Sequence, residues 1–126
     1  MIEVFPTAGL RPQLESAFAF AQRQVRALAE RDPDFYPMYT QGGKWRHAGE
    51  AWTHWCDGFL PGMMWIFAER TRDEVWKKLA ERYSRPLEPR RHDRNVHDLG
   101  FIFTSTYHRW FRLTGDEALE KVVIEA

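Results

Sequence analysis

The spacing of apolar residues along the chain predicts five helical segments. From Pro12 to about Arg31 an apolar residue recurs every three or four positions, which is typical of a helix that buries one face. Asp32-Pro33 is expected to end this helix, because a residue that precedes proline is pushed out of the helical region. The predicted buried stripe consists of Leu14, Phe18, Ala21, Val25 and Leu28.

The other four segments alternate between two kinds of helix. Residues 57–70 and 98–113 are apolar on nearly all sides, so each needs cover on more than one face. Residues 73–87 and 116–126 are amphipathic, and each begins at an aspartate that is suited to an N-cap. Residues 32–56 contain several glycines and prolines with little helical period, and we expect a long functional loop there.

An internal repeat supports this alternation. The segment Thr71–Leu79 (TRDEVWKKL) lines up with Thr114–Val122 (TGDEALEKV), 43 residues later, and Gly58-Phe59 matches Gly100-Phe101 one residue off that register. A period near 40 that contains two helices indicates an α-solenoid or a closed α/α toroid. Because a toroid has fully covered inner helices and amphipathic outer ones, we predict one all-α domain over residues 1–126, built of toroid hairpins, in preference to an open stack.

The two long connections are predicted to open at the same end of such a structure. Residues 32–56 and 89–97 each lead from an outer helix into the N-terminus of an inner one. Asp57 and Asp98 are candidate N-caps, since a carboxylate there accepts hydrogen bonds from free N–H groups of the first turn. The residues expected to meet at this mouth are Trp52, Trp55, Asp57, His97 and Asp98. Asp98 therefore has two readings, as a cap and as a site residue.

Two sequence blocks resemble the N-terminal part of the unsaturated glucuronyl hydrolases. They are Trp55–Trp65 (WCDGFLPGMMW) and His97–Phe101 (HDLGF), the second followed by Leu113–Asp116 (LTGD). The resemblance runs from about residue 45 to the C-terminus and implies an (α/α)₆ barrel. It also implies a glycoside hydrolase that removes 4,5-unsaturated uronic acid from the non-reducing end of lyase-generated oligosaccharides, by hydrating the C4–C5 double bond.

The resemblance assigns roles to four residues. Asp98 is implied to be catalytic, His97 to be its neighbour in the pocket, and Trp55 to pack on the unsaturated ring, with Trp52 as the alternative aromatic. The reaction needs a proton donor at the vinyl ether carbon and a base that activates water. In the family the principal acid/base aspartate lies beyond the point that matches Ala126. We therefore expect an N-terminal fragment that is inactive alone.

Composition narrows the range of partners. Lys and Arg total 18 and so do Asp and Glu, and this zero formal charge argues against nucleic acid and membrane surfaces as partners. No apolar run is long enough to span a bilayer, and the first residues do not resemble a signal peptide, so we expect a cytoplasmic protein. Aromatic residues make up 15% of the chain and suit the C–H faces of sugars.

Metal chemistry is not expected from the sequence. Cys56 is the one cysteine, and the five histidines lack a familiar ligand spacing, so we predict no metal and no cofactor. Arg90, Arg91 and Arg94 either attract an anionic sugar to the mouth or, as we prefer, form a solvated charged loop. Two alternative functions stay open. One is a non-catalytic helical-repeat interaction module that self-associates through exposed inner-helix faces, and the other is an unsaturated rhamnogalacturonyl hydrolase or a further α/α-barrel sugar enzyme.

Overall fold

The structure, a computed structural model, describes residues 8–126. These residues belong to two compact units, of which the first ends at Pro33 and the second runs from Asp34 to Ala126. The first unit holds a short 3₁₀ turn, Ala8–Leu10, and helix α1 (Arg11–Arg31). The single domain expected over residues 1–126 stays a prediction.

Helix α1 has the bounds that the apolar period predicts. It ends where the Asp32 N–H donates to the Leu28 carbonyl at 2.8 Å, directly before Pro33. Val25 and Leu28 are buried, whereas Leu14 at the other end of the predicted stripe is 66% exposed. The stripe is therefore buried only in its C-terminal half.

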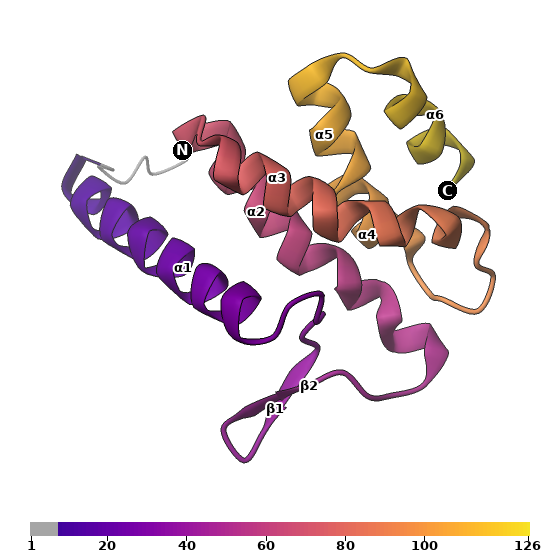
Figure 1. Cartoon of the computed structure of the whole chain (residues 1–126), viewed down its shortest axis with the longest axis horizontal. Coiled ribbons are helices and arrows are strands. Elements are labelled where there is room, and N and C mark those ends of the chain that lie inside the picture. Colours follow the sequence, from indigo (N-terminus) through magenta and orange to yellow (C-terminus); the bar gives the residue numbers. More distant parts are fainter. Residues whose placement is uncertain (1–7) are drawn as a thin grey trace, which may run out of the picture. The chain divides into compact units, whose positions relative to one another are not determined.

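The second unit is almost entirely helical, which confirms the all-α prediction (Figure 1). A single small antiparallel hairpin precedes its helices in the described chain, with strands β1 (Tyr39–Gln41) and β2 (Lys44–Arg46). One 3₁₀ helix, η2 (Ala51–Gly58), precedes the first pair of α-helices, and another, η3 (Arg85–His92), follows that pair. In chain order the helical elements are η2 (Ala51–Gly58), α2 (Phe59–Thr71), α3 (Glu74–Ser84), η3 (Arg85–His92), α4 (Leu99–Ser105), α5 (Tyr107–Thr114) and α6 (Glu117–Glu125).

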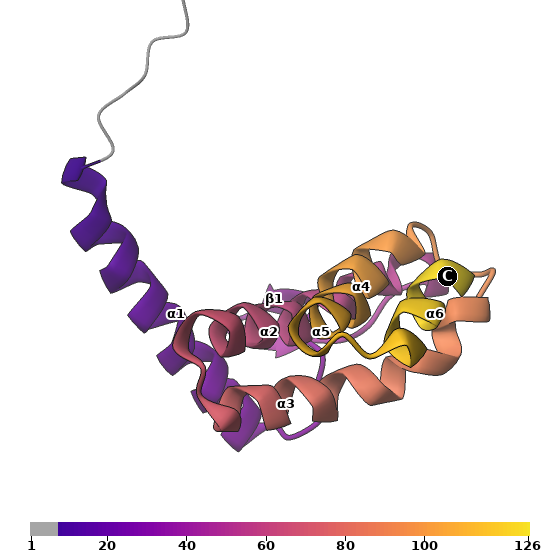
Figure 2. The ribbon, with the colours of Figure 1, turned by 90° about the horizontal axis from the view of Figure 1, so that it is seen from above.

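These helices form two hairpins. Helix α2 packs against α3, and α5 packs against α6, while α2 and α4 pack against each other between the hairpins. Figure 2 shows α3 along one edge of this group, with α2 next to it. Helix α2 buries more than one face but exposes Phe59 and Met63, whereas α3 buries one stripe, made of Trp76, Ala80, Tyr83 and Ser84. The predicted contrast between apolar and amphipathic helices is thus confirmed in the first hairpin.

The repeat extends to the hydrogen bonds at the helix ends. The Asp73 carboxylate accepts from the Val75 N–H at 2.9 Å and caps α3, and Asp116 accepts from the Ala118 N–H at the same distance and caps α6. Arg72 and Gly115, which precede the caps, are both left-handed, with φ of 56° and 72°. Both predicted N-caps are confirmed, one at α3 and one at α6.

The core lies where the inner helices meet. The indole rings of Trp65 on α2 and Trp110 on α5 stack, with centroids 5.2 Å apart, and Trp65 Nε1 donates to the buried Ser84 hydroxyl at 2.9 Å. Glycine allows α2 and α4 to approach closely. A Cβ at Gly58 would lie 2.5 Å from Ile102 Cα, and one at Gly62 would lie 3.0 Å from Ser105 Cβ.

Three boundaries differ from those predicted. The segment 98–113 is interrupted at Thr106, whose hydroxyl donates to the Ile102 carbonyl at 2.7 Å, a bond that often bends helices. Helix α3 ends at Ser84, because the two prolines that follow favour the tighter 3₁₀ form of η3. Residues 32–56 are not a plain loop, since Gly42 and Gly43, with φ of 55° and 72°, form the turn of the hairpin.

None of the helices in residues 8–126 combines the length and the apolar character needed to cross a lipid bilayer.

Candidate functional site

The two segments predicted to share a mouth do meet in the structure. The His97 N–H donates to the Trp52 carbonyl at 3.3 Å, which joins the start of α4 to the 3₁₀ helix η2. Helix η2 leads directly into α2, so the N-termini of two inner helices lie at the same end. Trp52, Trp55, His97 and Asp98 therefore belong to one region of the second unit.

An exposed aromatic surface lies at this end. The rings of Trp55, Phe59 and Phe101 contact one another, with centroid distances of 5.3 to 6.0 Å. Phe59 and Phe101 are 42% and 47% exposed, although they stand on inner helices. A shallow depression adjoins this surface and is lined by Asp98, Gly100, Phe101, Thr104 and Ser105. An apolar surface beside a carboxylate suits a ligand that has both C–H faces and hydroxyl groups.

Asp98 is not a side-chain cap, which corrects one of its two readings. It stands at the N-cap position of α4 in the left-handed conformation, with φ of 55° and ψ of 56°, and its side chain bonds to no N–H of the first turn. Its Oδ2 instead lies 2.7 Å from His97 Nδ1. The carboxylate is half exposed, so its second oxygen is open to a ligand.

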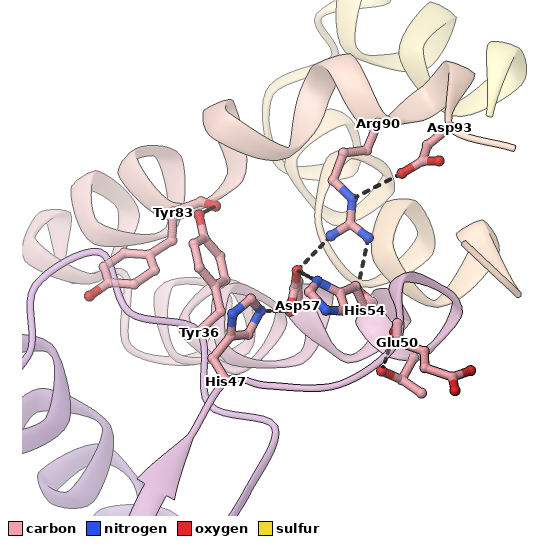
Figure 3. Close-up of polar contacts among 9 residues, drawn as sticks. Tyr36, His47, Glu50, His54, Asp57, Tyr83, Arg90 and Asp93 are labelled. Atoms are coloured by element: carbon pink, nitrogen blue, oxygen red, sulfur yellow. Dashed lines mark hydrogen bonds and ion pairs between the residues drawn. The ribbon is translucent and has the colours of Figure 1, made fainter. Parts of the chain in front are cut away.

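Asp57 is not a cap either, and its actual role was missed. Gly58 holds the cap position of α2, and the Asp57 side chain, 6% exposed, turns into the protein. Its Oδ1 lies 3.0 Å from His47 Nε2, and its Oδ2 accepts from Arg90 Nη1 at 2.6 Å (Figure 3). A buried carboxylate needs such partners, and here they outweigh capping.

Arg90 also corrects the prediction of a solvated arginine loop. Its guanidinium donates to the His54 carbonyl at 3.0 Å as well as to Asp57, and its Nε lies 4.0 Å from an Asp93 oxygen. The side chain is 18% exposed. Arg90 thereby ties η3 to η2, the helix that carries Trp52 and Trp55. Of the other two arginines, Arg91 pairs with Glu88 and Glu125, and Arg94 is exposed as expected.

The segment before the hairpin is anchored to helix α3. The Tyr36 hydroxyl donates to the Tyr83 carbonyl at 2.7 Å, and the Tyr83 hydroxyl accepts from the Asp34 N–H at 2.9 Å. Burial is the main cause that raises the pKa of Tyr36 well above its ordinary value, and the nearby Asp57 charge adds to it. Burial likewise raises the pKa of the Cys56 thiol, so this cysteine is a poor nucleophile at neutral pH.

One group of potential metal ligands emerges from the fold. His47, His54 and Asp57 place their ligand atoms within 4.8 Å of one another. The spacing of these residues in the sequence matches no familiar motif, which is why no metal was predicted. The signal in the sequence was the two histidines, His47 and His54, that precede Asp57.

Parts of the chain are similar to known hydrolases. An unsaturated glucuronyl hydrolase of Formosa agariphila is 29% identical over 70 residues, which are 56% of this chain and 18% of that protein. An unsaturated chondroitin disaccharide hydrolase of Streptococcus agalactiae is 32% identical over 75 residues, which are 56% of this chain and 19% of that protein. The chain is similar to unsaturated glucuronyl hydrolases.

The longest of these matches covers most of the chain. An unsaturated glucuronyl hydrolase of Bacillus sp. strain GL1 is 25% identical over 114 residues, or 87% of this chain and 29% of that protein. The resemblance read from the two sequence blocks is thus confirmed. The chain spans 18% to 29% of the length of these curated relatives. No protein-family model matches it, and neither does any solved structure.

Proposed function

We propose that this chain contributes the sugar-binding end of a glycoside hydrolase. The proposed substrate is an oligosaccharide that carries a 4,5-unsaturated uronic acid at its non-reducing end, as polysaccharide lyases leave it. The observation that carries the proposal is the half-exposed Asp98 carboxylate, which lines a depression together with the exposed ring of Phe101, against which the partly buried Trp55 packs, in a chain similar to such hydrolases. A cytoplasmic location is part of the proposal, and cell fractionation tests it.

The chemistry divides between binding and proton transfer. The C–H face of the unsaturated ring would pack on Trp55, with Trp52 as the second aromatic, because sugar rings and aromatic faces share apolar surface. Asp98, held by His97 at 2.7 Å, would accept hydrogen bonds from the ring hydroxyls and stay close to the reacting carbons. Protonation at C4 and addition of water at C5 then give a hemiketal, whose opening breaks the glycosidic link.

Binding to an unsaturated glucuronyl disaccharide tests this proposal directly. We expect the chain to bind the disaccharide in a calorimetric titration, and Asp98→Asn and Trp55→Ala to weaken binding at least about tenfold. Trp45→Ala is the control, because Trp45 is an exposed tryptophan on β2, outside the mouth. Binding that both site variants leave unchanged, or that the control weakens equally, would contradict the proposal.

Turnover is a separate measurement. Hydration removes the conjugated enol, so loss of its ultraviolet absorbance reports the reaction. Because the chain spans 18% to 29% of its relatives' length, we expect no loss of absorbance from the 126 residues alone. Any turnover would refute this expectation. A preference for an unsaturated rhamnogalacturonyl disaccharide over the glucuronyl one would favour the alternative sugar enzyme.

Self-association is the second candidate function. Its supporting observation is that Phe59, Met63 and Phe101 on inner helices are 38% to 47% exposed, and adjacent exposed apolar side chains often mark an interface. Sedimentation equilibrium tests this candidate. A chain that remains monomeric up to millimolar concentration excludes it, whereas a dimer that Phe101→Gln dissociates supports it.

A further inference from the structure

We propose that His47, His54 and Asp57 form a binding site for one divalent transition-metal ion, with zinc as the best-suited ion. The fold brings the three residues together from the turn after β2 and from η2. Two imidazoles and one carboxylate are a ligand set that binds zinc and iron in proteins, and they leave further coordination positions open to water. This site does not depend on the glycosidase proposal.

The distances between the ligand atoms are close to those a metal requires. Ligands that bind zinc at about 2.0–2.2 Å lie about 3.0–3.6 Å from one another. His47 Nε2 and Asp57 Oδ1 already lie 3.0 Å apart, so an ion could take the place of the shared proton. His54 Nδ1 lies 3.9 Å from Asp57 Oδ2, and the three ligand atoms lie within 4.8 Å of one another, so the His54 ring must move toward Oδ1 to complete the site. The two imidazole rings lie edge to face at 68°, with centroids 4.7 Å apart.

Arg90 both supports and weakens this site. Its guanidinium binds Asp57 Oδ2 at 2.6 Å and leaves Oδ1, the oxygen that faces His47, available to an ion. A hydrogen bond to the outer oxygen of a ligating carboxylate holds that ligand in orientation. The positive charge of Arg90 also opposes a divalent cation, so we expect micromolar affinity at best.

The exposure of the ligands allows an ion to enter. The Asp57 side chain is 6% exposed, whereas those of His47 and His54 are 30% and 28% exposed. The carboxylate therefore forms the floor of the site and the imidazoles form its solvent side. A bound ion would join the residue after β2 to the helix that carries Trp52 and Trp55.

Metal titration of the 126-residue chain tests the site without any activity assay. After removal of metals with EDTA, we expect calorimetry to show one equivalent of Zn²⁺ bound and Co²⁺ to give visible absorption bands. His47→Gln and His54→Gln should each weaken Zn²⁺ binding at least about tenfold. Zn²⁺ should also raise the Tm of the wild-type chain, and not that of His47→Gln. Mg²⁺, which prefers oxygen ligands, should have no effect.

The matched control is His97→Gln. His97 also lies beside a carboxylate, with Nδ1 2.7 Å from Asp98 Oδ2, and among the described residues no second imidazole joins this pair in a ligand cluster. Its substitution should leave Zn²⁺ binding unchanged. The proposal is wrong if no ion binds, if binding survives in both site variants, or if His97→Gln weakens it equally. Circular dichroism checks that each variant is folded. If His54→Gln does not fold, the His47→Gln variant decides the outcome, because His47 is exposed.

Discussion

Gly58→Ala is the sharpest test of how α2 and α4 are packed. A Cβ at residue 58 would lie 2.5 Å from Ile102 Cα and 2.8 Å from the Phe101 carbonyl oxygen. Both are backbone atoms of α4, so no side-chain rotation relieves the contact. Gly58 has φ of −75° and ψ of −18°, a conformation that alanine adopts freely. Space alone, and not backbone conformation, therefore requires glycine here.

The expected cost follows from that geometry. Non-bonded carbon atoms prefer separations of about 3.5–4.0 Å, so α4 must move by about 1 Å. Overpacking of this kind destabilises a fold by about 1–3 kcal/mol. Alanine offsets about 0.4–1 kcal/mol of this, because it lowers the conformational entropy of the unfolded chain. Because the atoms in contact are backbone, we take the upper end and predict a net loss of about 2 kcal/mol in the free energy of unfolding.

The repeat provides the matched control for this variant. Gly100, at the start of α4, is the counterpart of Gly58 in the repeat, and a Cβ there meets no atom within 4 Å. Gly100→Ala should therefore be neutral or stabilise the fold by about 0.5–1 kcal/mol, as expected for alanine in place of glycine in a helix. Urea unfolding followed by tryptophan fluorescence measures both variants. The change in the free energy of unfolding is calculated from the shift in the urea midpoint, with the slope m unchanged.

Two results would refute this reasoning. Gly58→Ala could unfold at the same urea concentration as the wild type, or Gly100→Ala could be destabilised as much as Gly58→Ala. A further consequence can be checked on the folded variant. Because a shift of α4 moves Asp98 away from Trp55, Gly58→Ala should also weaken binding of the unsaturated disaccharide.

Three other predictions concern the ion pair, the caps and a tyrosine. Arg90→Ala should lower the free energy of unfolding by about 3 kcal/mol, because it leaves the buried Asp57 carboxylate without its cation; a loss below about 1 kcal/mol in urea unfolding would contradict this. Asp73→Ala should cost about 1 kcal/mol through loss of a cap, whereas Asp98→Asn, which removes no cap, should change thermal stability by less than about 0.5 kcal/mol. The pKa of Tyr36 is raised in the folded state, so with rising pH the unfolded chain loses the hydroxyl proton before the folded chain does. The contribution of Tyr36 to the free energy of unfolding is therefore complete below about pH 10 and decreases as the pH rises further. Urea unfolding from pH 8 to 11 should show that the free energy of unfolding falls less steeply in Tyr36→Phe than in the wild type. Equal slopes would show that Tyr36 does not contribute to this fall.

The parts of the fold that depend on local sequence were predictable. The caps at Asp73 and Asp116 repeat the same Thr-x-Asp-Glu pattern, and each accepts its bond at 2.9 Å as a cap should. The end of α1 before Pro33 follows from a steric rule that involves two residues. In these cases the atoms that decide the structure are within a few residues of one another.

The parts that depend on distant partners were not predictable in this way. Asp57 has the residue type and the position of an N-cap, yet Arg90, 33 residues later, and His47 take its carboxylate. The ion pair with Asp57 also leaves the Arg90 side chain largely buried, although Arg90 was predicted to lie in a solvated loop. The hairpin turn is a different case, because Gly42-Gly43 between short polar strands was a visible signal of a tight turn.

The left-handed backbone at Asp98 has a consequence for how this protein could evolve. Glycine, asparagine and aspartate adopt φ near 55° at less cost than most other residues, so few replacements at position 98 preserve the start of α4 without strain. Of these, asparagine differs from aspartate by one base in the codon and keeps the shape of the side chain while it removes the charge. A single base change can therefore yield a descendant that folds normally and lacks the carboxylate, and natural variants with asparagine at this position would be expected to keep the fold and to bind the proposed sugar weakly.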